Sequence, residues 1–171
     1  MIMQYTSAQA NKLLKKLNET QNAILKKEGM SKEFLASLGE DIECIRPAYN
    51  FIETNKEVNT LNEQIRKVKH AINVFNVQTV IPEFNITIDE ALVLIPQLTQ
   101  LKAKLSSMKD KLPKMREQGM YSRNSGIVEY RYLNYDIYEV EKEFEMVSEK
   151  LTKLQTALDI VNNGNFIDIE L

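Results

Sequence analysis

Apolar residues recur at alternating steps of three and four positions in three separate stretches of the chain. This spacing is typical of coiled-coil-like helices, each of which buries one narrow apolar stripe against another helix. We therefore predict three long helices that pack through these stripes. The stripe residues are Phe51, Val58, Leu61, Ile65, Val68, Ile72 and Phe75, with the polar Thr54 in the one remaining position, then Leu94, Leu98, Leu101, Leu105, Met108 and Leu112, and finally Ile137, Val140, Phe144, Val147, Leu151, Leu154, Leu158 and Val161.

Local signals at the helix ends set the expected boundaries and add a fourth helix near the N-terminus. Thr6 with Gln9, and Thr87 with Glu90, have the spacing of a capping box, in which the two side chains bond free backbone N–H groups at a helix start. Gly29 is placed to end the N-terminal helix in the left-handed conformation. The predicted helices span about residues 6–28, 47–76, 88–112 and 136–163.

Three short segments are predicted to be extended, because they contain β-branched and aromatic residues that alternate with polar ones. They span about residues 77–86, 127–133 and 166–171, and the first is predicted to form a hairpin. If consecutive long helices run antiparallel, the C-terminal strand lies beside residues 77–86, and residues 127–133 lie at the opposite end of the last helix. We expect the small sheet to cover the apolar run at residues 92–95.

Together these elements predict a mainly α fold. The expected architecture is an antiparallel bundle of long helices, or a coiled-coil-like body, with small β elements at one or both ends. A chain of 171 residues fits a single domain spanning residues 1–171. With 43% hydrophobic and 27% charged residues, the composition is that of a folded chain.

Charge and composition disfavour several classes of function. The net charge of -2 gives no overall attraction for nucleic acid or anionic membranes. The first residues do not have the basic and apolar pattern of a secretory signal, and no apolar run approaches the roughly 20 residues that span a bilayer, so we expect a cytoplasmic protein without a secretory signal or a membrane span. Cys44 is the single cysteine, which excludes an internal disulfide and a Cys-rich zinc site. No catalytic, metal-binding or phosphate-binding motif is present, so we expect neither enzyme activity nor a cofactor.

Basic residues concentrate in the second half of the third predicted helix and just beyond it. One interpretation is contact with the phosphate backbone of tRNA or DNA. The interpretation that we favour is pairing with the acidic first half of the last predicted helix, because antiparallel packing makes the two segments neighbours. The basic residues are Lys102, Lys104, Lys109, Lys111, Lys114 and Arg116, and the acidic ones are Glu139, Glu141, Glu143, Glu145 and Glu149.

Three other groups could take part in chemistry or binding. His70, the only histidine, lies away from the apolar stripe and is predicted to face solvent. Glu139 and Glu143 share a helix face, which we interpret as a solvated pair rather than catalytic carboxylates. Tyrosines after the third predicted helix could stack on nucleotide bases or form a packing interface, and we favour the interface. These tyrosines are Tyr121, Tyr130, Tyr132, Tyr135 and Tyr138.

Residues 65–76, 87–97 and 134–162 resemble an uncharacterised family of small helical proteins from gram-positive gut bacteria. More distantly, Asn73 and Asn76, followed by Thr87-Ile88 and Ala91-Leu92, resemble a broader bacterial family of helical-hairpin proteins of unknown function. Some members of that family are labelled septicolysin, a haemolysin-like name. The resemblance implies a helical fold and a cytoplasmic bacterial setting, and it implies no catalytic residues.

Our leading hypothesis from the sequence is a non-catalytic protein-interaction or scaffolding protein that acts through coiled-coil-like helices. The narrow stripes favour a homo-oligomer, with a dimer preferred, and an unknown protein partner. The first alternative is nucleic-acid binding through the basic residues between positions 102 and 116. The second is a membrane-active, haemolysin-like protein, which rests on the family label alone.

Overall fold

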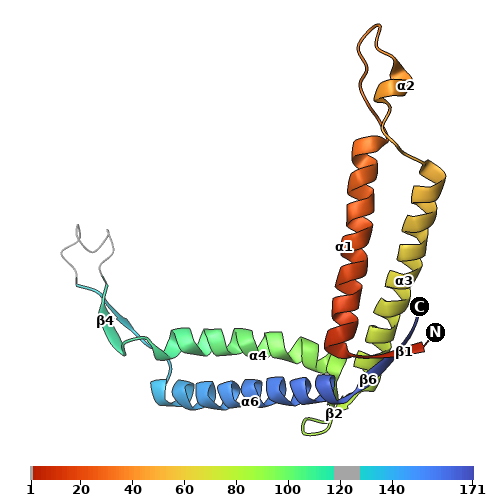
Figure 1. The fold of residues 1–171 in the computed structure, drawn as a ribbon. Helices are drawn as coiled ribbons and strands as arrows, with labels where there is room; N and C mark the ends of the chain where they lie inside the picture. Colours follow the sequence, from red (N-terminus) through yellow and green to blue (C-terminus); the bar gives the residue numbers. More distant parts are fainter. Residues whose placement is uncertain (1, 118–127) are drawn as a thin grey trace. The chain divides into compact units, whose positions relative to one another are not determined.

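The computed structural model describes residues 2–117 and 128–171 and has a mainly α fold with small antiparallel strand pairs, as predicted (Figure 1). Its elements are β1 (Ile2–Thr6), α1 (Ser7–Ser31), α2 (Ile42–Ile45), α3 (Phe51–Gln78), β2 (Val80–Ile81), β3 (Ile86–Thr87), α4 (Ile88–Lys109), β4 (Lys114–Arg116), β5 (Tyr130–Tyr132), α6 (Ile137–Gly164) and β6 (Phe166–Glu170).

The chain divides into two compact units. The first unit contains Met1–Thr79 and Ile160–Leu171, and the second contains Val80–Asp159. Helix α6 crosses the boundary between them, because the boundary falls inside its residue range.

In the first unit, α1 and α3 pack side by side as a helical hairpin (Figure 1). Strands β1 and β6 pair antiparallel, with Ile2 opposite Glu170 and Thr6 opposite Phe166. Along β6 the side chains alternate between exposed and buried positions, as expected for a strand with one covered face. The buried cluster draws on both helices and this strand and contains Ala10, Val68, Ile72, Ile167 and Ile169.

In the second unit, β2 and β3 form a short hairpin that leads directly into α4. Helices α4 and α6 lie side by side (Figure 1). Two lysines of α4 contact an aromatic ring of α6. The apolar stripes predicted from the sequence supply the buried side chains of both helices. These include Leu98, Leu105, Val140, Val147, Leu151 and Leu154.

The start of α4 confirms its predicted capping box. The Thr87 Oγ1 atom accepts a hydrogen bond from the Glu90 N–H at 3.2 Å, and the Glu90 carboxylate accepts one from the Thr87 N–H at 2.7 Å. The bond from the Thr87 N–H, and a second one that the Thr87 hydroxyl donates to the same carboxylate at 3.0 Å, hold the pKa of Glu90 below its usual value. The box predicted at Thr6 and Gln9 is also present.

Replacing Thr87 with alanine is expected to lower the free energy of unfolding by about 1 kcal/mol, because a free N–H group at the helix start loses its acceptor. Urea denaturation followed by circular dichroism measures this loss. Thr99→Ala is the matched control, since Thr99 lies in the middle of the same helix and bonds only the Ile95 carbonyl oxygen. An equal loss in both variants would contradict the capping role of Thr87.

Three local predictions are wrong. The C-terminal strand pairs with β1 and not with residues 77–86, where β2 and β3 pair with each other. Gly29 does not end the first helix, which continues to Ser31. In the run at 92–95, which the small sheet was expected to cover, Leu92 and Val93 remain exposed.

Candidate interaction surfaces

Two classes of site find no support in the part of the chain that the structure describes. None of the helices in residues 2–117 and 128–171 combines the length and hydropathy needed to cross a bilayer. Within the same residues, no three side chains among histidine, cysteine, aspartate and glutamate gather in a way that could hold a metal ion.

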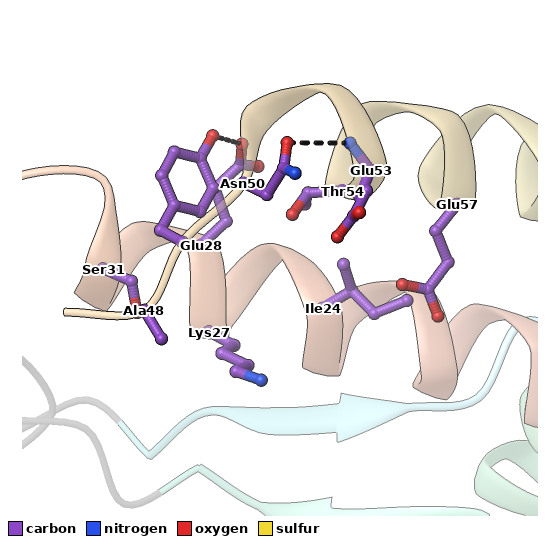
Figure 2. Close-up of a pocket in the computed structure, with 10 residues that line it drawn as sticks. Ile24, Lys27, Glu28, Ser31, Ala48, Asn50, Glu53, Thr54 and Glu57 are labelled. Atoms are coloured by element: carbon purple, nitrogen blue, oxygen red, sulfur yellow. Dashed lines mark hydrogen bonds between the residues drawn. The ribbon is translucent and has the colours of Figure 1, made fainter.

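A polar groove of about 530 Å³ lies between the end of α1 and the start of α3 (Figure 2). The Tyr49 hydroxyl donates a hydrogen bond to the Glu28 carboxylate at 2.6 Å, which ties the connection between the helices to α1. The Asn50 Oδ1 atom accepts hydrogen bonds from the N–H groups of Ile52 and Glu53, and so caps α3. Because these contacts hold the end of α1 and the start of α3 in place, we interpret the residues that line the groove as structural.

The Tyr49–Glu28 bond gives a pH-dependent prediction. The hydrogen bond to Glu28, together with desolvation and the negative charge of Glu28, raises the pKa of Tyr49 above its ordinary value of 10.0. A raised pKa in the folded state means that the bond stabilises the protein fully below pH 10.0 and stops doing so as the pH rises through the raised pKa. Tyr49→Phe is therefore expected to lower the melting temperature at neutral pH, and the difference from the wild type should shrink in strong alkali.

Tyr138→Phe is the control for this experiment, because the Tyr138 side chain is exposed. Thermal denaturation across a pH series measures both variants. A pH-independent difference between Tyr49→Phe and the wild type would contradict a role for the hydroxyl proton.

The connection between α1 and α3, residues 32–50, leaves large apolar side chains uncovered, and we call it the tip loop. Leu35 is 98% exposed, and Leu38 is fully exposed. An uncovered group of this kind typically marks an interaction site, since isolated exposed apolar residues are normal but clustered ones are not. Its exposed large apolar residues are Phe34, Leu35, Leu38, Ile42 and Ile45.

The six basic residues proposed as a nucleic-acid face do not form one surface. Lys102 and Lys109 are half-buried, and their Nζ atoms lie 5.7 Å and 4.6 Å from the centre of the Phe144 ring on α6. Lys104 is exposed on α4. The helix ends at Lys109, three residues earlier than predicted, so the other three follow it. Lys111 lies just after the helix, and Lys114 and Arg116 lie in β4.

The acidic half of α6 makes no ion pair with α4 among the described residues. Glu149 pairs with Lys153 of its own helix at 2.7 Å, and this contact lowers the pKa of Glu149 and raises that of Lys153. Glu139 and Glu143 are exposed. The two helices are neighbours as predicted, but the predicted ion pairs between them are wrong. Lys102 and Lys109 of α4 contact the Phe144 ring instead.

Strands β4 and β5 place positive charge and aromatic rings on one face. Lys114 lies opposite Tyr132, and Arg116 lies opposite Tyr130. Because side chains alternate between faces, these four residues share one side of the hairpin, which we call the basic aromatic face. The Lys114 Nζ atom lies 4.2 Å and 5.3 Å from the centres of the Tyr130 and Tyr132 rings.

The opposite face of this hairpin has one cation and two carboxylates. Arg131 lies opposite Met115 and pairs with Glu117 at 2.9 Å. The carboxylates of Glu117 and Glu129 belong to this opposite side by the same alternation. Within residues 2–117 and 128–171, the two cations of the basic aromatic face form no ion pair with a carboxylate, and its tyrosines remain 45% and 62% exposed.

The remaining candidates have structural or solvent-exposed positions. His70 is exposed, as predicted. The Tyr135 hydroxyl donates to the Met108 carbonyl oxygen at 2.9 Å and so closes the end of α4, whereas Tyr121 lies outside the described residues. Cys44 is exposed, and its Sγ atom lies 3.3 Å from an Asp41 carboxylate oxygen.

Sequence reasoning missed the tip loop as a candidate surface. The signal was available, because Phe34, Leu35, Leu38, Ile42 and Ile45 crowd into a segment that the helix pattern assigns to a connection. A connection of this kind has no apolar helix stripe through which to bury large apolar side chains, so a cluster of them there indicates an interaction surface.

The fold is similar to that of one solved structure, "Crystal structure of a functionally unknown conserved protein from Corynebacterium diphtheriae". The likeness covers 96% of this chain and 99% of that chain, with a TM-score of 0.61 and 18% sequence identity. At this identity the likeness concerns the fold alone. No family model matches the chain, and no curated protein is significantly similar to it in sequence.

Proposed function

We propose that the chain is a non-catalytic protein-interaction or scaffolding protein that works as a homo-oligomer, with a dimer as the simplest assembly. The observation that supports this most directly is the exposed apolar group of the tip loop. The long helices hold the tip loop in place. Many of their stripe residues are already buried within the chain, so the helices themselves offer fewer apolar positions to a partner.

A protein surface suits the tip loop better than a lipid surface. The loop has four carboxylates, on Glu33, Glu40, Asp41 and Glu43, against two cations, on Lys32 and Arg46. The resulting negative charge opposes binding to anionic lipids, which attract basic segments. A protein partner can bury the same apolar side chains and also supply complementary charge.

The oligomeric state tests this proposal. Light scattering coupled to size exclusion, over a range of protein concentrations, is expected to give a mass above that of one 19.8-kDa chain. The double variant Leu35→Ser/Leu38→Ser should shift the equilibrium toward the monomer, because it removes the most exposed apolar side chains of the loop.

Val93→Ser is the matched control, since Val93 is also an exposed aliphatic residue but lies on α4 outside the tip loop. It should leave the mass unchanged. A wild-type protein that stays monomeric at every concentration would contradict the proposal.

Nucleic-acid binding is the second candidate, and the basic aromatic face favours it. Exposed tyrosines beside cations can stack on unpaired bases. If this proposal holds, fluorescence anisotropy at low salt should detect binding of a single-stranded oligonucleotide, and Tyr130→Thr/Tyr132→Thr should weaken it. Lys104→Ala is the control, because Lys104 is exposed on α4 outside this face. Absence of binding at low salt would end this candidate.

A further inference from the structure

We propose that the tip loop of one copy docks on the basic aromatic face of a second copy of this chain, an inference that rests on the homo-oligomer proposed above. Two different surfaces meet in this contact; made twice between two copies it closes a dimer, and made head to tail it continues into a ring or filament. The tip loop, in the first unit of one chain, binds the basic aromatic face, in the second unit of the other chain.

Charge complementarity is the first argument. The tip loop has four carboxylates and two cations, whereas residues 111–117 and 128–133 have four cations, Lys111, Lys114, Arg116 and Arg131, and two carboxylates, Glu117 and Glu129. The excess charges are therefore equal in size and opposite in sign. On the basic aromatic face the match is sharper, since both carboxylates of the hairpin lie on its other side.

The apolar groups of the two surfaces also complement each other. The tip loop exposes aliphatic chains, above all Leu35 and Leu38, together with one aromatic ring, Phe34. The hairpin exposes two tyrosine rings, whose faces offer flat apolar area and whose hydroxyl groups can remain in water. Tyrosine and arginine are enriched among residues that dominate binding, and the hairpin face combines both types.

The same charges disfavour the alternative ways of joining two copies. A contact between two tip loops would bring two negative surfaces together, and a contact between two basic aromatic faces would bring two positive ones together. Like charges across an interface suppress association. Opposite charges on the two surfaces thus favour a contact between a tip loop and a basic aromatic face over a contact between two like surfaces.

Nucleic acid is a weaker match for the basic aromatic face. Strong binding to a phosphate backbone rests on several lysine or arginine contacts, often six to ten. Here Lys114 and Arg116 share the face, while Lys102 and Lys109 lie against Phe144 on α6. The same chain, by contrast, presents an apolar surface with matching negative charge.

A mixing experiment tests the inference. One protein has the tip substitutions Leu35→Ser/Leu38→Ser, and the other has the face substitutions Tyr130→Thr/Tyr132→Thr, in which threonine keeps a high strand propensity. Analytical ultracentrifugation of each variant alone should show self-association weakened by at least about tenfold in the dissociation constant. An equimolar mixture should form mixed complexes, because the first variant keeps an intact face and the second keeps an intact tip loop.

A charge-exchange pair gives a second test that leaves the tyrosines in place. Glu33→Lys/Glu43→Lys makes the tip loop basic, and Lys114→Glu/Arg116→Glu makes the hairpin face acidic. Each variant alone should associate poorly, since its two surfaces then have the same sign. High salt screens the repulsion within each variant, so the association of each variant alone in high salt is the reference. The mixture should associate at least that well, and its affinity should fall as salt is added.

The outcomes separate this inference from the proposal on which it rests. Normal self-association of the Tyr130→Thr/Tyr132→Thr variant, with loss only in the tip variant, would mean that the tip loop docks somewhere other than this face, and it overturns the inference while the homo-oligomer stands. Mixtures that stay monomeric, while the wild type associates, overturn it as well. A wild type that is monomeric throughout overturns both. Loss of oligonucleotide binding but not of self-association in the face variant assigns that face to nucleic acid and overturns the inference.

Discussion

Replacing Ile169 with aspartate is expected to lower the free energy of unfolding by about 3–5 kcal/mol, the range seen when a buried charge has no partner. Ile169 is 1% exposed and belongs to the buried cluster formed by α1, α3 and β6. A carboxylate there meets apolar side chains such as Val68 and Ile72 instead of a cation. Urea denaturation followed by circular dichroism measures the loss, and a partial or complete loss of helix at neutral pH is the extreme outcome.

Phe166→Asp is the matched control for this prediction. Phe166 lies on the same strand but is 60% exposed, so a carboxylate there stays in water. We expect a change below about 1 kcal/mol, which is usual for surface substitutions. Equal losses in the two variants would show that β6 does not turn alternate side chains toward α3, and the described packing would be wrong.

The pairing that places Ile169 in this cluster was the part of the fold that local sequence patterns could not predict. Residues 2–6 have no strong alternation of apolar and polar side chains, and most of β1 is exposed. Their partner, β6, lies at the other end of the chain, and the contact between the Gln4 amide and the Asp168 carboxylate spans 164 positions. Patterns of period two or 3.6 report which face of a segment is buried, but they do not specify which distant segment covers it.

Features that depend on neighbours in sequence were predicted well. The capping boxes at Thr6 and Thr87 are both present, because the bonding groups lie only three residues apart. The stripes of the long helices supply Leu61, Val68 and Ile72 to the buried side chains of α3. Local chemistry therefore fixed the starts of two helices and the buried sides of the long ones.

The candidate surfaces were harder to predict because exposure depends on what is missing around a residue. The tip loop contains five large apolar residues, and only the structure shows that Leu35 and Leu38 among them are exposed. The run at 92–95 shows the same limit, since the small sheet expected to cover it does not form: β6 pairs with β1, and β2 pairs with β3. Similarly, the sequence placed basic and acidic segments side by side but could not foresee that Phe144 would take the place of the carboxylates.

Replacing Leu151 with aspartate is expected to cost about 3–5 kcal/mol of stability in the second unit, for the same physical reason as at Ile169. Leu151 is 7% exposed and belongs to the longest apolar stripe, in which Val147 and Leu154 are also buried. Lys150→Asp is the control, because it introduces the same carboxylate one position away on the exposed side of α6. Urea denaturation should separate the two variants by several kcal/mol. Since a shift of one position turns a helical side chain by about 100°, similar stabilities would mean that the stripe assigned to α6 is not the side it buries.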